Sequence, residues 1–158
     1  MGAGVPAGEA EPLTGFLQRI FACTPEVAEH VGRRAAERAW PARAVILRQG
    51  DGAEHAYLMV AGRAQALLYG LEGQLVLLHE FTPGDLFGAV TELDARPQDA
   101  DIVAAEPTRA ALFSALEFLG LVEAHACIGL AVSRMLLKQL RASTTRRSEE
   151  HTSELQSH

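Results

Sequence analysis

The segment Pro83–Val103, PGDLFGAVTELDARPQDADIV, decides how the whole chain is interpreted. It opens with a Pro-Gly-Asp turn, reaches Gly88 and a short stretch that can expose backbone amides, and returns as a strand from Ala100. Backbone N–H groups gathered at such a turn favour a bound anion. The place where a cation should complete the site holds Gln98-Asp99. The segment therefore predicts the scaffold of a phosphate-binding turn without its cation.

The composition is that of one domain with an ordinary core. The chain has 158 residues, of which 48% are hydrophobic, which argues against disorder. No apolar run reaches the ~18 residues that cross a bilayer. Met1–Pro12 lacks the basic start and apolar middle of a signal peptide, so we expect a disordered leader on a cytoplasmic protein without membrane contact. A formal net charge of -6 provides no overall basic surface for nucleic acid.

Reactive side chains are few and dispersed. Cys23 and Cys127 cannot by themselves make a disulfide framework or an iron–sulfur cluster, so we expect small buried hydrophobic residues. A metal-binding jelly-roll enzyme would need closely spaced His pairs and a carboxylate on facing strands. No H-x-H occurs, and the histidines before the tail are His30, His55, His79 and His125. The sequence thus indicates no catalytic residue, no metal site and no cofactor.

Sequence patterns typical of helices occur near both ends of the chain. Apolar residues at helical spacing predict a helix over 14–21. The run Thr-Pro-Glu that begins at Thr24 combines a capping hydroxyl, a first-position Pro and an acid, and predicts a helix that ends at Arg38. Near the other end, Ser114 caps a helix that ends at Ala124, and a longer apolar helix follows over 126–141.

Between these helices, Gly-containing turns separate short apolar segments, as is typical of antiparallel strands. The expected strands are Ala44–Arg48, Tyr57–Val60, Ala64–Tyr69, Leu75–Phe81, Asp101–Ala105 and Arg109–Phe113. We therefore predict an α+β fold that is mainly β. The strand pattern fits an antiparallel sandwich or a jelly-roll β-barrel, flanked by N-terminal helices and C-terminal helices.

The last helix carries apolar residues on two faces. These are Ile128, Val132 and Met135 on one side and Leu130, Leu137 and Leu140 on the other. A helix that is apolar on two sides needs two partners. The chain's own barrel can provide one, and the same helix of a second subunit can provide the other. We predict a homodimer with Ile128, Val132 and Met135 in its interface; one broad face on a single larger core is the alternative.

In this order, the parts resemble the cyclic-nucleotide-binding-like sensor domain of the cyclic-AMP receptor protein/Fnr (Crp/Fnr) family of bacterial transcription regulators. The resemblance covers about Thr14 to Arg141. It is carried by RQGD (Arg48–Asp51), YLMVAGRAQALLY (Tyr57–Tyr69), PGDLFG (Pro83–Gly88) and ADIVAAEPTRAALF (Ala100–Phe113). Glycines stand at turns where the family has them, at Gly50, Gly62, Gly84 and Gly88.

The resemblance implies a phosphate cassette that has lost its recognising side chains. In the family, a Glu binds a ribose hydroxyl, an Arg pairs with the cyclic phosphate, and a Ser or Thr donates to a phosphate oxygen. Here Ala89 stands in the place of the Glu, Gln98 in that of the Arg and Asp99 in that of the Ser. The remaining cassette positions are Phe87, Gly88, Pro97 and Ala100, which match, and Val90, which replaces a Leu.

These replacements predict weak or absent binding of cyclic nucleotides. A carboxylate about 4 Å from a phosphate repels it by roughly 4 kcal/mol at an effective dielectric constant near 20. Loss of the Arg contact removes roughly another 1.5–3 kcal/mol. Together they would weaken micromolar binding to millimolar or beyond. Arg96 is the alternative cation, and Gln98 and Asp99 could instead bind an uncharged or cationic effector.

We expect a sensor domain over residues 13–125 and a dimerisation helix over 126–146. The tail 147–158, RSEEHTSELQSH, has no apolar period and is expected to be structureless. It also resembles the translation of a sequencing adapter. The resemblance implies that DNA binding requires a helix-turn-helix domain, which we expect to be missing here. It therefore implies a truncated regulator. Its small-molecule effector is unknown. A stand-alone, channel or kinase regulatory domain of the same fold is the alternative.

Resequencing of the source locus tests whether the tail is foreign. We expect the codons after about Arg146 to differ from those that encode RSEEHTSELQSH. The measurement is a genomic read from an independently prepared library. The same twelve codons in that read would show that the tail belongs to the gene.

Overall fold

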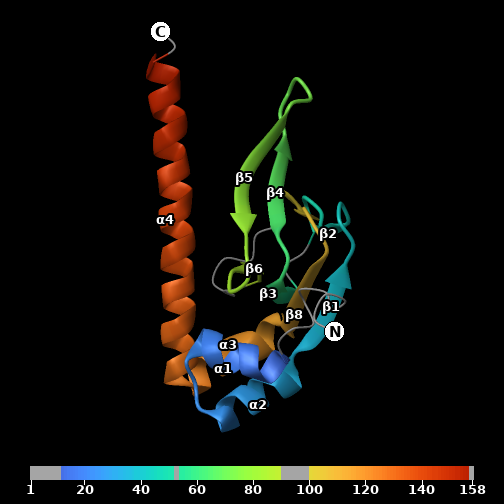
Figure 1. Cartoon of the computed structure of the whole chain (residues 1–158), viewed down its shortest axis with the longest axis vertical. Coiled ribbons are helices and arrows are strands. Elements are labelled where there is room, and N and C mark those ends of the chain that lie inside the picture. Colours follow the sequence, from blue (N-terminus) through green and yellow to red (C-terminus); the bar gives the residue numbers. More distant parts are fainter. Residues whose placement is uncertain (1–11, 52–53, 90–99, 157–158) are drawn as a thin grey trace, which may run out of the picture.

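The computed structural model describes residues 12–51, 54–89 and 100–156, with side chains described as far as Ala142. Four helices and eight strands lie within these residues (Figure 1). The helices are α1 (Leu13–Phe21), α2 (Pro25–Arg34), α3 (Ala115–Ala124) and α4 (Ala126–Gln156). The strands are β1 (Ala36–Trp40), β2 (Val45–Leu47), β3 (His55–Ala61), β4 (Ala64–Tyr69), β5 (Leu75–Phe81), β6 (Leu86–Gly88), β7 (Asp101–Ala104) and β8 (Thr108–Ser114).

The strands form two four-stranded antiparallel sheets. The strand orders are β1-β8-β3-β6 and β2-β7-β4-β5. Figure 1 shows α1, α2 and α3 gathered at one end of the roll, while the β4–β5 hairpin projects from the other end and α4 extends alongside. This architecture confirms the predicted α+β, mainly β, jelly-roll fold.

Strand β3 divides the interior into two hydrophobic cores. Alternate residues of a strand point to opposite faces of its sheet. Accordingly Leu58 belongs to the core that the helices cover, whereas its neighbours Tyr57 and Met59 belong to the core between the two sheets. All three are buried. A strand covered on both faces reads as a continuous apolar run, which explains the sequence AYLMVA.

The two predicted helix caps are present. The Thr24 hydroxyl accepts a hydrogen bond from the Val27 amide at 3.3 Å, with Pro25 as the first residue of α2. The Ser114 hydroxyl accepts one from the Glu117 amide at 3.2 Å at the start of α3. Each cap satisfies an amide that the first helical turn cannot pair.

The predicted extent of α2 was wrong. The helix ends at Arg34, not Arg38, because Ala35 is extended at φ -90° and ψ 142°. The chain then forms β1, which pairs along its whole length with Leu112–Thr108 of β8. Residues 35–38 are good helix formers with no Gly or Pro to stop them, so pairing with β8 overrides the local preference.

The predicted structureless tail was also wrong, because α4 continues without a break to Gln156. Beyond Gly129 the helix contains no Gly and no Pro, and many of its residues have good helix propensity. The absence of an apolar period shows only that the segment has no face for a core; it does not prevent a helix.

The two cysteines are not free buried residues, as the sequence analysis expected. Cys23 and Cys127 form a disulfide across 104 residues of sequence, with their Cα atoms 5.7 Å apart. The fold brings the α1–α2 connection against the first turn of α4, and this Cα separation suits a disulfide. Sequence spacing alone could not reveal that approach.

Candidate effector site

The Pro83-Gly84-Asp85 turn is fastened to β3. The Gly84 amide donates to the Met59 carbonyl at 2.8 Å, and the Met59 amide donates to the Asp85 carbonyl at 2.9 Å. The buried Asp85 carboxylate accepts from the Thr82 amide at 2.9 Å. These bonds fasten the turn, and with it the start of β6, to β3.

Gly88 is required by the geometry of the cassette. Its φ of +82° lies in the left-handed region, and a Cβ atom added there would lie 2.5 Å from the His55 carbonyl oxygen and 2.9 Å from the Tyr57 ring. Any other residue would be strained and would push β6 away from β3. A glycine at position 88 is therefore required by the backbone conformation and by the close approach of β3.

The amide that follows Gly88 does not point to a free anion site. The Ala89 N–H donates to the His55 carbonyl at 2.8 Å, which extends the pairing of β6 with β3. For Ala89, this corrects the expectation that the amides after Gly88 are exposed. The Ala89 side chain, which the sequence analysis aligned with the family's Glu, is buried.

Stacked aromatic rings fill the described space beside the cassette. Phe87 lies 4.8 Å from the Tyr57 ring, nearly parallel to it, and 4.9 Å from Phe81 of the opposite sheet, measured between centroids. All three side chains are buried. Burial raises the pKa of the Tyr57 phenol, which keeps it neutral. The described surroundings of Phe87 are therefore buried and aromatic.

The structure covers half of the predicted cassette. It places Phe87, Gly88 and Ala89 at the end of β6 and the buried Ala100 just before β7. The other predicted site residues lie outside the described residues; they are Val90, Arg96, Gln98 and Asp99.

A contact between α4 and the cassette strand was missed by the sequence analysis. The Leu86 amide donates to the Gln139 Oε1 atom at 2.9 Å, and Gln139 Nε2 donates to the Leu86 carbonyl at 3.0 Å. Leu86 is on the edge strand of its sheet, so the amide group of Gln139 replaces a missing neighbouring strand. The sequence did contain an indication of this contact. Gln139 follows Met135 by four residues, so it lies on the same helix face as Ile128, Val132 and Met135.

The residues predicted for the dimer interface face the core of their own chain instead. Ile128 and Val132 are only 1% and 7% exposed and, with the partly buried Met135, pack in the core of their own chain. The second apolar face of α4 is the exposed one: Leu130, Leu137 and Leu140 are 55%, 51% and 62% exposed. Both predicted apolar faces are present; the one predicted for the dimer interface is buried in its own chain, and the other is exposed.

Neither a metal centre nor a membrane span is found among the described residues. No three His, Cys, Asp or Glu side chains of this part of the chain come together in a way that could hold a metal. His30 and His125 approach to 5.5 Å between ring centroids without a third ligand of that kind. No single described helix is long and apolar enough to cross a bilayer, and the helix pair that qualifies jointly, α3 with the first part of α4, is bent by 115°.

The two four-stranded sheets, the Pro-Gly-Asp turn fastened to β3 and the left-handed Gly88 define a jelly-roll domain with helices at one end. The family model of the cyclic nucleotide-binding domain matches residues 37–125, more than half of the chain. The chain belongs to the cyclic nucleotide-binding domain family.

Relatives share this domain within longer proteins. A lysophospholipase of Aspergillus oryzae is 26% identical over 132 residues, which are 84% of this chain but 8% of that protein. The cyclic AMP receptor protein of Thermus thermophilus is 29% identical over 104 residues, 66% of this chain and 48% of that protein. The crystal structure of the Thermus thermophilus catabolite activator protein has a TM-score of 0.67 at 25% identity, covering 84% of this chain and 62% of that one. The chain therefore spans less than half of either curated relative.

Replacement of Gln139 by Ala tests the contact between α4 and β6. We expect Gln139→Ala to lower the free energy of unfolding by about 1–3 kcal/mol, since two buried backbone groups of Leu86 lose their partner. Chemical denaturation measures the loss, and hydrogen exchange of the Leu86 amide should accelerate. The matched control is Lys138→Ala, an exposed neighbour, for which we expect a change within about 0.5 kcal/mol. Equal stability of the two variants, with the Leu86 amide still protected, would contradict the contact.

Proposed function

We propose that this chain is the sensor and dimerisation region of a Crp/Fnr-type transcription regulator whose cassette no longer recognises cyclic nucleotides. Residues 13–125 form the sensor in this proposal, and residues 126–146 form the dimerisation helix. Family membership supports a regulatory binding domain. The observation that supports the rest is Ala89, a buried residue that the motif comparison aligns with the ribose-binding Glu of the family.

The replaced side chains act on the same ligand. The Ala89 methyl accepts no hydrogen bond from a ribose, and its amide is already paired with His55. In the sequence, Gln98 supplies no charge and Asp99 adds a negative one. A cyclic phosphate would meet net repulsion where the family offers an ion pair.

In this proposal the effector is a different small molecule, and the protein acts in the cytoplasm. DNA is contacted by a helix-turn-helix domain of the kind that follows the last helix in the regulators which this chain resembles. The chain matches 48% of the length of the Thermus thermophilus cyclic AMP receptor protein. This share is compatible with the chain being the sensor part of a longer regulator.

The alternative is a true cyclic-nucleotide-binding module in which Arg96 replaces the missing cation. The similarity to a protein named as a cyclic AMP receptor favours it. The same module could regulate a channel or a kinase or act alone. Nucleotide titration separates this alternative from the main proposal.

Titration calorimetry of the chain with cyclic AMP and cyclic GMP tests the loss of recognition. We expect no saturation below about millimolar nucleotide, the range to which the lost contacts lead. Restoration of the three side chains together, Ala89→Glu, Gln98→Arg and Asp99→Ser, should create binding. Asp99→Ser should contribute most, because it removes repulsion.

The controls for this titration address folding and Arg96. Because position 89 is buried, Ala89→Glu alone leaves a carboxylate without a partner, so thermal unfolding must show that the triple variant is folded. Micromolar binding by the unchanged chain would refute the proposal. If Arg96→Ala then abolished that binding, Arg96 would be the cation of the alternative.

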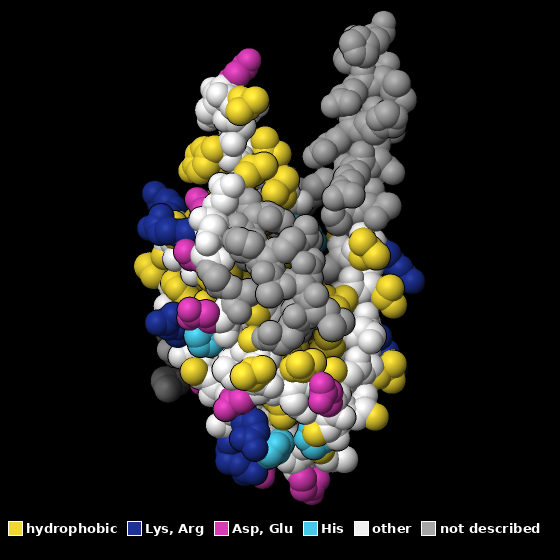
Figure 2. All heavy atoms as spheres, turned by 180° about the vertical axis from the view of Figure 1, so that it is seen from behind, with side chains coloured by type: hydrophobic (Ala, Val, Ile, Leu, Met, Phe, Trp, Pro, Cys, Tyr) yellow, Lys and Arg dark blue, Asp and Glu magenta, His cyan; other side chains and the backbone are white. Residues whose placement is uncertain are grey.

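The exposed face of α4 supports the dimer. Leu137 follows Leu130 by seven residues and Leu140 follows by three more, the spacing of a coiled-coil seam. Figure 2 shows hydrophobic side chains on the β4–β5 hairpin and on α4. Since the other face of α4 is already covered by the chain's own core, we assign the exposed stripe to the same helix of a second subunit.

Charge substitution on this stripe tests the dimer. We expect Leu137→Glu with Leu140→Glu to raise the dimer dissociation constant about a hundredfold or more, because an unpaired buried carboxylate costs several kcal/mol. Light scattering measures the mass as a function of concentration. Leu116→Glu, at a still more exposed leucine of α3, is the control and should leave the dimer intact. A monomeric unchanged chain at high micromolar concentration would disprove the dimer.

A further inference from the structure

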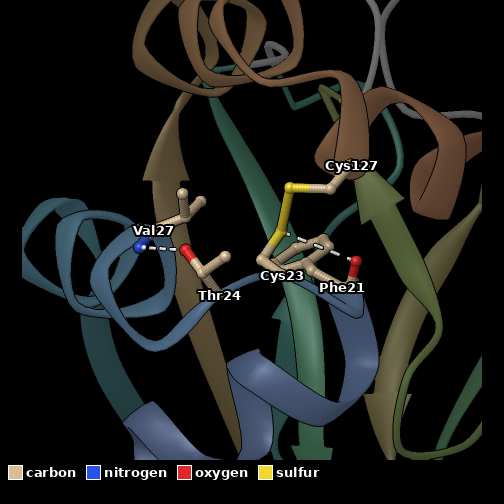
Figure 3. Close-up of a disulfide and its surroundings, with 5 residues drawn as sticks. All are labelled: Phe21, Cys23, Thr24, Val27 and Cys127. Atoms are coloured by element: carbon tan, nitrogen blue, oxygen red, sulfur yellow. Dashed lines mark hydrogen bonds between the residues drawn. A yellow bond between two sulfur atoms is a disulfide. The ribbon is translucent and has the colours of Figure 1, made fainter.

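The disulfide lies at the base of α4. Cys23 is in the short connection between α1 and α2, and Cys127 is the second residue of α4 (Figure 3). Both residues are partly buried and pack against the core that the helices cover. The bond therefore attaches the helix to the N-terminal helices, at the opposite end from the projecting hairpin of Figure 1.

The position of each sulfur suits reversible chemistry. Cys127 is in the first turn of α4, where the positive end of the helix dipole stabilises a thiolate. The Cys23 sulfur lies 3.6 Å from the Phe21 carbonyl oxygen, which can accept the hydrogen of a reduced thiol. Both residues are partly exposed, as attack by a small thiol or disulfide requires.

We propose that Cys23 and Cys127 form a redox-responsive bond that controls how firmly the base of α4 is held. In the oxidising direction, the Cys127 thiolate attacks one sulfur of a low-molecular-weight disulfide and releases one thiol. The Cys23 thiolate then displaces the second thiol and closes the bond. Two electrons and two protons pass from the cysteine pair to the small disulfide, which becomes two thiols. A small thiol reverses both steps.

The bond matters because two attachments at separate points hold α4, in addition to the core packing of Ile128 and Val132. The disulfide holds its first turn, and Gln139 holds the cassette strand about 18 Å further along the helix axis. Reduction releases the first point only. The redox state thus sets the mobility of the helix that carries both the exposed leucine stripe and the contact with Leu86, whether or not the cassette binds a nucleotide.

Glutathione titration of the whole chain tests the proposal. The chain is equilibrated with mixtures of reduced and oxidised glutathione, acid-quenched and alkylated, and the two cysteines are quantified by mass spectrometry. We expect full and reversible conversion between disulfide and dithiol without denaturant. On reduction, amide exchange over residues 126–132 should accelerate about tenfold, while that over β3 stays unchanged.

Cysteine variants provide the controls. Cys23→Ser with Cys127→Ser should exchange over residues 126–132 like the reduced chain and should not respond to glutathione. In single variants, the thiol of Cys127 should acquire glutathione faster than that of Cys23. A disulfide that resists reduction in the folded chain, thiols that never oxidise, or an exchange rate unchanged by reduction would each overturn the proposal.

Discussion

Burial of β3 on both faces is the constraint on which the rest of the structure depends. Its alternating side chains supply the helix-covered core on one side and the aromatic core between the sheets on the other. Its backbone pairs with β8 and β6, and Met59 also binds the Pro-Gly-Asp turn. A shift of one residue in this strand would exchange the two cores, so its register fixes the position of the cassette as well.

The cassette lies where the two cores meet. Leu86 packs under the helices, and Phe87 packs between the sheets, although the residues are adjacent. A ligand that altered the packing of Phe87 would therefore act on a strand that Gln139 of α4 also holds. This gives the proposed sensor a physical connection between its ligand site and its dimerisation helix that does not depend on which ligand binds.

Much of the architecture could be predicted because its signals are local. The starts of α2 and α3 could be predicted from the capping side chains of Thr24 and Ser114. Strands β4 and β5 have the predicted bounds because turns delimit them. Gly88 could be placed for a similar reason, since only glycine accepts its backbone conformation beside His55. For the candidate site, Ala89 was recognisable from its place in the motif.

The features that only the folded chain reveals join residues distant in sequence. Residues 36–40 have no local strand signal, and they form β1 because β8 offers an open edge. Cys23 and Cys127 are 104 residues apart, and Leu86 and Gln139 are 53 apart, so no spacing rule connects them. Likewise, both apolar faces of α4 were visible in the sequence, but packing alone decided that Ile128 and Val132 turn inward and the leucine stripe outward. Periodicity defines the faces of a helix, whereas the choice of the buried face depends on the shape of the core it meets.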